Sequence, residues 1–208
     1  MSKTPLRCMP RARAWPQSMT ATLWISSLMP NGRLTGAGTT TSRTRSFPRW
    51  QTRSILCRAG SSSARALANF RDDRQVHTLS GLKTRLCLAD PESSAFHRHL
   101  ADRDVVSWCG NAPLIEGIGC PRCEPSFIPE LIDACYAVPD VASIGSTRAL
   151  IRHVGRSCGG STGTNLYAAA QVIAGMKTRN EAGSVVTLLC DSGERYRSTI
   201  LDDARLAE

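Results

Sequence analysis

The chain has 208 residues, enough for one domain of ordinary size with its own core. Residues 1–71 contain twelve Lys and Arg and no Asp or Glu, whereas residues 72–208 contain fourteen basic and seventeen acidic residues, so the net charge of +9 describes neither half. No stretch approaches the roughly 18 apolar residues of a membrane span, and the N-terminus lacks the apolar core of a secretory signal. We therefore expect no membrane partner and a cytoplasmic location.

The N-terminal segment, residues 1–80, has no pattern that specifies a core. Polar runs such as Thr39–Ser42 and Ser61–Ser63, with scattered Arg and Pro, interrupt every apolar stretch before a helical or strand period develops. This composition predicts a basic, disordered segment. A nucleic-acid-binding arm with Trp15, Trp24 and Trp50 for stacking is one alternative, and a transit peptide is another. The segment shows no amphipathic order, so we expect a nucleic-acid partner to be unlikely.

The second segment, residues 81–208, alternates strand-like and helix-like stretches. In chain order the patterns predict a strand over Thr84–Ala89 that ends at Asp90-Pro91, a helix over Ile128–Tyr136, a helix from Asp140 as N-cap to near Gly155, a helix from Thr164 or Asn165 to Met176, and a strand over Ser184–Cys190. Such alternation is typical of an α/β fold with a mostly parallel sheet.

The nine cysteines are odd in number and irregularly spaced. Cys87 and Cys190 end or interrupt apolar strand-like runs, which favours buried thiols in a reducing compartment over a disulfide framework. Cys120 and Cys123 have the spacing of half a zinc site, but no second pair follows, so we expect no metal. His97 and His99 are interpreted as exposed residues of a connecting segment.

Three short motifs carry the candidate chemistry. The glycine-rich stretch Gly159–Asn165 is predicted to be a loop opening a helix, where backbone N–H groups and hydroxyls approach a ligand. The stretch Cys190–Tyr196 follows the last predicted strand, and ligands of open α/β sheets bind at that edge. Ile115–Gly119 places two glycines around one isoleucine, a pattern of tight turns.

In this order, EGIG, SFIP, GGSTGTN and VVTLLCDSGERY resemble the C-terminal part of the cysteine synthase family. The resemblance covers about Gly81 to Glu208. The family comprises pyridoxal-phosphate enzymes and includes O-acetylserine sulfhydrylase, cystathionine β-synthase and cysteine desulfhydrase. The resemblance implies part of the large domain of the tryptophan-synthase-β-like fold, called fold type II, and a pyridoxal 5′-phosphate cofactor. It also implies an amino-acid substrate and a homodimer.

The resemblance also implies site residues. Ser192 would face the pyridine nitrogen of the cofactor, and a hydroxyl there would leave that nitrogen largely unprotonated, which suits β-elimination or β-replacement on cysteine or an O-activated serine. Gly117 and Gly119 would line the cofactor's face. Ser161, Gly163 and Thr164 would belong to the loop beside the active site.

Two parts of the family's machinery are missing from the sequence. The chain has only Lys3, Lys83 and Lys177, none in a context that resembles the family's catalytic lysine. The loop that grips the cofactor phosphate should stand just before Gly81, where the chain reads CRAGSSSARALANFRDDRQVHTLSG instead. Synonymous codons for the segment from Ile55, read in a displaced frame, can yield family-like text such as WIVVGAGTG. We therefore expect an out-of-frame segment at 1–80, no catalytic residue in this chain, and an inactive fragment.

Overall fold

The computed structural model describes the backbone of residues 23–28, 34–37 and 54–59, and both backbone and side chains of residues 84–206. Six strands form one sheet in the order β2-β1-β6-β3-β4-β5. Five of the strands run parallel: β1 (Leu23–Leu28), β6 (Ser184–Leu189), β3 (Ser54–Ala59), β4 (Arg85–Pro91) and β5 (Ala134–Val138). Strand β2 (Leu34–Ala37) pairs antiparallel with β1. The carboxyl ends of the five parallel strands therefore share one edge of the sheet.

Three of these strands lie in the segment that the sequence predicts to be disordered. The prediction is wrong for β1, β2 and β3, because their backbones pair with the sheet: β3 joins β4 to β6, and β1 pairs with β6. Each of β1 and β3 contributes only six residues, too short a run to stand out between polar neighbours, and strand pairing decides their structure. The rest of residues 1–80 lies outside the described residues, as does the stretch expected in place of the phosphate loop from Gly60 onward.

The two strands predicted in the second segment are confirmed. Strand β4 begins and ends within two residues of the predicted run, and β6 stops one residue short of Cys190. Six consecutive residues of β4, from Leu86 to Pro91, are buried, as expected for a parallel strand that is covered on both faces. Leu86 and Leu88 face one side of the sheet and pack against α2 (Phe96–Ala101) in one cluster. Cys87 faces the other side and packs against α4 (Gly160–Thr178).

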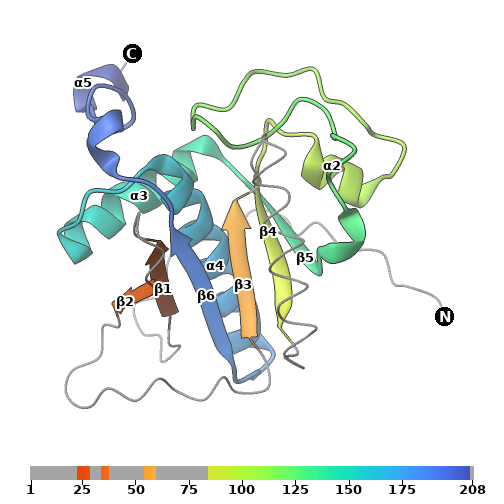
Figure 1. The fold of residues 1–208 in the computed structure, drawn as a ribbon, viewed down its shortest axis with the longest axis horizontal. Helices are drawn as coiled ribbons and strands as arrows, with labels where there is room; N and C mark the ends of the chain where they lie inside the picture. The colour runs from red at the N-terminus through yellow and green to blue at the C-terminus, as the bar shows by residue number, and fades with distance from the viewer. Residues whose placement is uncertain (1–22, 29–33, 38–53, 60–83, 207–208) are drawn as a thin grey trace.

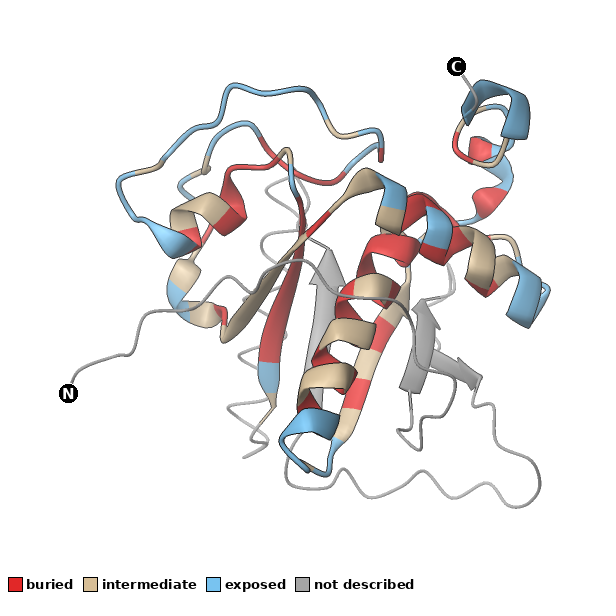
Figure 2. Cartoon of the chain, turned by 180° about the vertical axis from the view of Figure 1, so that it is seen from behind, coloured by how far each residue is buried: buried red, intermediate tan, exposed pale blue. Residues whose placement is uncertain are grey.

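One long helix covers the second face. Figure 1 shows α4 running behind β6 and β3, and Figure 2, seen from behind, shows buried residues along the length of this helix. The buried side chains of this face are Ala169, Val172, Ile173 and Met176, which pack with Val185 of β6. Helix α3 (Asp140–Val154) lies beside α4 and ends at Gly155, whose φ of 70° is the left-handed conformation that glycine favours.

Two helix predictions need correction. Asp140 is the first residue of α3 and not its cap: Pro139 is the cap, and the Asp140 carboxylate accepts the backbone N–H of Leu114 at 2.9 Å. The helix predicted over Ile128–Tyr136 is wrong, because Pro129–Leu131 forms only one 3-10 turn, η1, and the chain then enters β5. The backbone N–H of Asp133 donates to the carbonyl oxygen of Leu86 at 2.9 Å, and Oδ2 of Asp133 accepts the backbone N–H of Leu86 at 2.8 Å, which aligns the start of β5 with β4.

After β6 the chain makes a second 3-10 turn, η2 (Gly193–Tyr196), and a short helix, α5 (Asp203–Leu206). Arg148 of α3 holds this end of the chain, because its guanidinium donates to the carbonyl oxygen of Ile200 and pairs with Asp203. Within the described residues, no helix has the length and apolar character needed to cross a membrane.

Candidate functional site

The exit of β6 is tied to the start of α4 at the carboxyl edge of the sheet. The backbone N–H of Gly159 donates to the carbonyl oxygen of Asp191 at 3.1 Å, and the backbone N–H of Cys190 donates to the Thr162 hydroxyl at 3.0 Å. The side-chain amide of the fully buried Asn165 donates to the carbonyl of Leu188 at 3.2 Å and to the Cys190 sulfur at 3.4 Å. These contacts fix the first two turns of α4 against the residues that leave β6.

The stretch predicted as a glycine-rich loop is largely helical. Helix α4 begins at Gly160, four or five residues before the predicted start, so Gly160–Asn165 forms its first turns and the loop prediction is wrong there. The glycines allow close packing at this start. A Cβ built on Gly159 would lie 2.0 Å from Oδ1 of Asp191, and one on Gly160 would lie 2.7 Å from Ile115.

Gly163 and Thr164 serve the contact between α3 and α4. A Cβ on Gly163 would lie 2.0 Å from the carbonyl oxygen of Ser143, so only glycine lets the two helices approach this closely. The buried Thr164 hydroxyl shares a hydrogen bond of 2.8 Å with the Ser143 hydroxyl. Both residues therefore have a packing role that the sequence analysis did not identify. Ser161 is half-buried in the first turn of α4, beside them.

A carboxylate and a phenol form a close pair in the turn after β6. The Tyr196 hydroxyl donates to Oδ2 of Asp191 at 2.6 Å, while Oδ1 of Asp191 is buried and has no hydrogen-bond partner among the described residues. Burial raises the pKa of Tyr196 to about 12, and its hydrogen bond to Asp191 adds to this effect. Tyr196 therefore stays protonated as a donor at neutral pH.

Ser192, the residue predicted to face the cofactor's ring, lies in the same turn. It is exposed, and its hydroxyl oxygen accepts the backbone N–H of Glu194 at 3.4 Å as the cap of η2. The structure thus places Ser192 at the expected edge but engages its oxygen with local backbone.

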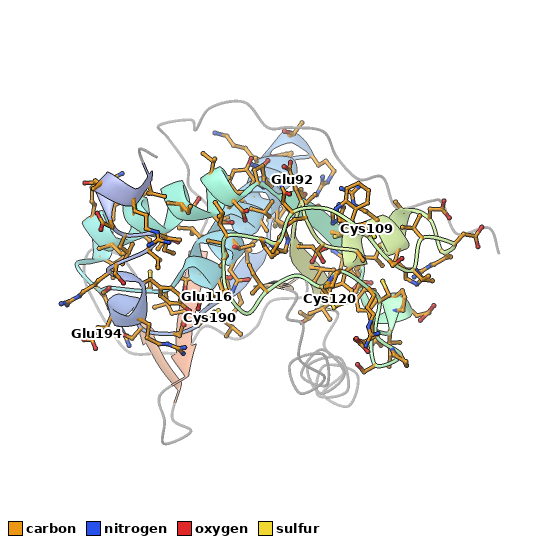
Figure 3. The ribbon with its side chains drawn as sticks, turned by 90° about the horizontal axis from the view of Figure 1, so that it is seen from above. Glu92, Cys109, Glu116, Cys120, Cys190 and Glu194 are labelled. Atoms are coloured by element: carbon orange, nitrogen blue, oxygen red, sulfur yellow. The ribbon has the colours of Figure 1, made fainter. Side chains whose placement is uncertain are left out.

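The Ile115–Gly119 motif comes to the same edge. Gly117 and Gly119 have φ values of 80° and 75°, so both glycines are needed for the backbone conformation, as the pattern predicts. Between them, Ile118 packs in a cluster with Ile115, Ile144, Tyr196 and Ile200. Glu116 is near enough to Tyr196 that its charge contributes to the raised pKa of the phenol. Figure 3 shows Glu116, Cys190 and Glu194 on one side of the molecule, away from Cys109 and Cys120.

Sequence reasoning missed a buried pair at the end of β4. Oδ2 of Asp90 accepts the backbone N–H of His97 at 2.9 Å and lies 2.9 Å from Nδ1 of the same residue. His97 is only 8% exposed and Asp90 is fully buried, so the interpretation of His97 as exposed is wrong. His99 is half-buried, with Nδ1 3.0 Å from the carbonyl oxygen of Val105. The sequence feature that could have indicated this pair is the short spacing between Asp90 and His97, which lie on either side of a turn.

The burial of the cysteines differs in part from the prediction. Cys87 is fully buried as expected, but Cys190 is exposed, because β6 ends before it and the chain turns outward there. Cys158, just before the start of α4, is buried, and burial together with the nearby Cys190 raises the pKa of its thiol to about 11. No group of three or more His, Cys, Asp or Glu side chains in the part of the chain that the structure describes could hold a metal ion.

Comparison with known proteins finds relatives named as a cysteine desulfhydrase and a cysteine synthase. The chain is 48% identical over 120 residues to an L-cysteine desulfhydrase of Mycobacterium tuberculosis, a match that covers 58% of this chain and 33% of the relative. It is 32% identical over 129 residues to cysteine synthase 2 of Schizosaccharomyces pombe, covering 57% of this chain and 32% of the relative. In its matched part, this chain resembles the cysteine synthase family. The chain spans about a third of the length of these relatives.

The fold agrees with this assignment. The crystal structure of an O-ureido-L-serine synthase superposes with a TM-score of 0.57 at 21% identity, covering 76% of this chain and 48% of that one. The cysteine synthase-like part thus has the fold of type II pyridoxal-phosphate enzymes, and the fold class predicted from the sequence is confirmed. No protein-family model matches the chain.

Proposed function

We propose that the described edge forms one wall of a pyridoxal-phosphate site that serves β-elimination or β-replacement on cysteine or an O-activated serine. The observation that carries this proposal is the convergence of three motifs. The turn after β6, the start of α4 and the Ile115–Gly119 segment meet around Tyr196 and the isoleucine cluster. The similar proteins reported above include a cysteine desulfhydrase and a cysteine synthase.

The residues present fit the ring side of such a cofactor. The turn contains a buried acceptor without a donor, Oδ1 of Asp191, which lies where a side chain on Gly159 would stand. Ile118 and Gly119 supply apolar and backbone surface at the same edge. When bound, the cofactor would accept the electron pair left at the α-carbon of an amino acid. In this proposal Gly117, Gly119, Ser161 and the turn containing Ser192 lie around the ring, with Gly163 and Thr164 supporting α4 from behind.

The same reaction needs a base at the α-carbon, and in this family that base is a lysine. Among the described residues the one lysine is Lys177, in the last turn of α4. Lys177 lies 17 positions after Gly160, which is roughly 25 Å along a helix. We therefore infer that the 208-residue chain is catalytically silent.

We also propose that residues 1–80 are an out-of-frame segment and that residues 81–208 are the cysteine synthase-like unit. The charge difference between the two segments and the missing phosphate loop support this division. Re-sequencing the coding DNA from upstream of Met1 through Gly81 tests it. Lost bases near codons 67–69 and 80–81 would support the proposal, and an uninterrupted frame confirmed by peptide mass spectrometry of residues 1–80 would refute it.

The test of the site is ligand binding by the full chain. Pyridoxine 5′-phosphate is the suitable probe, because its alcohol does not react with lysines and its fluorescence reports binding. We expect saturable binding that is lost in Gly159→Val, whose side chain would displace the Asp191 carboxylate, and retained in Gly145→Ala, where a Cβ meets nothing within 4 Å. Absence of saturable binding by the wild-type chain contradicts the proposal.

A cytoplasmic location and a homodimer remain proposals for this chain. The rival function, nucleic-acid binding, depends on residues 1–71, whose side chains lie outside the described residues, and the relatives reported above are named as enzymes of amino-acid chemistry. Sedimentation of the full chain at several concentrations tests the homodimer, for which a mass of twice 22.5 kDa is expected.

A further inference from the structure

We propose that Cys190 is a modification site at which hydrogen peroxide forms a sulfenic acid, and that the side-chain amide of Asn165 holds the oxidised thiol. The two residues lie where the chain leaving β6 meets the start of α4. The inference goes beyond the proposed cofactor site and does not depend on it, because neither the thiol nor the amide needs a bound cofactor for this chemistry.

The Cys190 thiol is accessible to a small oxidant but belongs to a fixed part of the backbone. The residue is exposed, because β6 ends at Leu189 and the chain turns outward there. Its backbone N–H donates to the Thr162 hydroxyl at 3.0 Å, and the next residue, Asp191, is held by the backbone N–H of Gly159. The sulfur therefore meets solvent at a defined position.

The Asn165 side chain brings both a donor and an acceptor to this sulfur. Its Nδ2 donates to Sγ of Cys190 at 3.4 Å and to the carbonyl oxygen of Leu188 at 3.2 Å, which uses both amide hydrogens. Oδ1 of the same amide is buried and has no hydrogen-bond partner among the described residues. Because Asn165 is fully buried, bulk water does not satisfy this acceptor, and a new donor on the neighbouring sulfur would.

The peroxide alone balances the oxidation. The Cys190 thiolate attacks one oxygen of hydrogen peroxide, an S–O bond forms and the O–O bond breaks, and the departing hydroxide takes up the proton of the thiol to give water. The sulfur loses an electron pair, which reduces the peroxide. The amide N–H of Asn165 stabilises the negative sulfur, and the new sulfenic O–H is a donor for Oδ1. One amide therefore favours both the reactive form and its product.

The buried thiol of Cys158 favours a sulfenic acid that persists. Cys158 is 3% exposed and packs with Leu150 and Leu166. Burial raises the pKa of this thiol to about 11, and the nearby Cys190 contributes, so Cys158 stays protonated at neutral pH. A protonated, buried thiol is a poor attacking group. We therefore expect the oxidised Cys190 not to close a disulfide with Cys158.

The test compares two exposed cysteines of the same full chain. Cys109 is exposed like Cys190 but lies away from it, out of reach of the Asn165 amide (Figure 3). The native protein is treated with hydrogen peroxide in the presence of dimedone, which traps sulfenic acids, and peptide mass spectrometry measures the adduct at each cysteine. A hydrogen bond to the charged sulfur predicts about tenfold more adduct at Cys190 than at Cys109.

Two substitutions separate the amide from the surrounding structure. Asn165→Leu removes the amide, and the ratio of adducts should fall to about one. Thr162→Val removes the hydrogen bond to the Cys190 backbone but keeps the amide, so it should keep the wild-type ratio. Thermal unfolding shows whether each variant is folded, and the comparison of the two cysteines in wild type decides the matter where Asn165→Leu is not.

Three results would overturn the inference. They are equal adducts at Cys190 and Cys109 in wild type, an undiminished ratio in folded Asn165→Leu, and a disulfide between Cys158 and Cys190 in place of the adduct. None of them bears on the cofactor proposal, which the binding of pyridoxine 5′-phosphate tests separately.

Discussion

The backbone N–H of Gly159 donates to the carbonyl oxygen of Asp191 across 3.1 Å, joining the residue before α4 to the turn after β6. Around this bond, Thr162 and Asn165 of α4 bind Cys190 and Leu188. The glycine-rich motif and the strand-end motif, more than 20 residues apart in the sequence, are therefore one structural unit. Its shape depends on glycines, whose lack of a side chain allows neighbouring atoms to pack closely, and on side chains that form hydrogen bonds with backbone groups.

The close approach of α3 and α4 at Gly163 predicts a large effect of one methyl group. A Cβ in Gly163→Ala would lie 2.0 Å from the Ser143 carbonyl oxygen and 2.1 Å from the Thr147 hydroxyl. We expect a loss of about 2 kcal/mol or more in the free energy of unfolding, measured in urea. The matched control is Gly145→Ala on α3, which is exposed and has free space, and which should be neutral or stabilising by up to about 1 kcal/mol. Equal effects of the two substitutions would contradict the packing described here.

The Tyr196 phenol predicts an alkaline loss of stability. Burial raises its pKa to about 12 from an ordinary value of 10.0. Because the folded-state pKa is the higher one, the stabilisation is complete below pH 10 and is lost as the pH rises toward 12. Tyr196→Phe should therefore show a smaller decline of the unfolding free energy between pH 10 and 12 than wild type. Tyr167→Phe on α4 is the control, and an identical decline in wild type and Tyr196→Phe would refute the prediction.

The thiols near the site should differ in reactivity. Cys158 is 3% exposed, and burial raises its pKa to about 11, so little thiolate is present at pH 7.5. Iodoacetamide should modify the exposed Cys109 and Cys190 in the native protein, whereas Cys158 should react only after denaturation. Peptide mass spectrometry over a time course measures this. Modification of native Cys158 at the rate of Cys109 would show that the start of α4 is open.

The Asp90–His97 pair predicts a stability cost at the end of β4. His97→Ala removes the ring nitrogen 2.9 Å from Oδ2 and leaves a fully buried carboxylate with one backbone donor. We expect a loss of about 1–3 kcal/mol in unfolding free energy. His153→Ala, in the exposed last turn of α3, should change it little. A neutral His97→Ala would mean that the pair contributes nothing to stability.

The sequence was sufficient for those elements whose pattern is local. The continuous apolar run of β4 and the run of β6 are recognisable because a buried parallel strand is apolar on both faces. Helix α3 is recognisable by its periodicity and by Gly155. The helix predicted at Ile128–Tyr136 failed because pairing with β4, a long-range contact, decides the structure of Ala134–Val138. Pairing likewise decides β1 and β3.

The sequence predicted where in the fold the candidate site lies, but not which side-chain atoms form it. Motif order located the edge, and the positive φ values of Gly117 and Gly119 agree with the expected turn. The pattern of small residues at 159–165 does not distinguish a ligand loop from a helix start that packs against another helix. Nor does a sequence show which of two adjacent polar residues, Asp191 or Ser192, turns inward, because η2 decides this.

The central claim is that this chain carries a cysteine synthase-like cofactor wall without the lysine that removes the α-proton. The most direct test is sulfide release from L-cysteine by the purified full chain with added pyridoxal phosphate, compared with pyridoxal phosphate alone. We predict equal rates with and without protein, in a preparation that binds pyridoxine 5′-phosphate. Sulfide release above the protein-free rate that is abolished by Asp191→Asn would contradict the account, because it would show a complete active site in this chain.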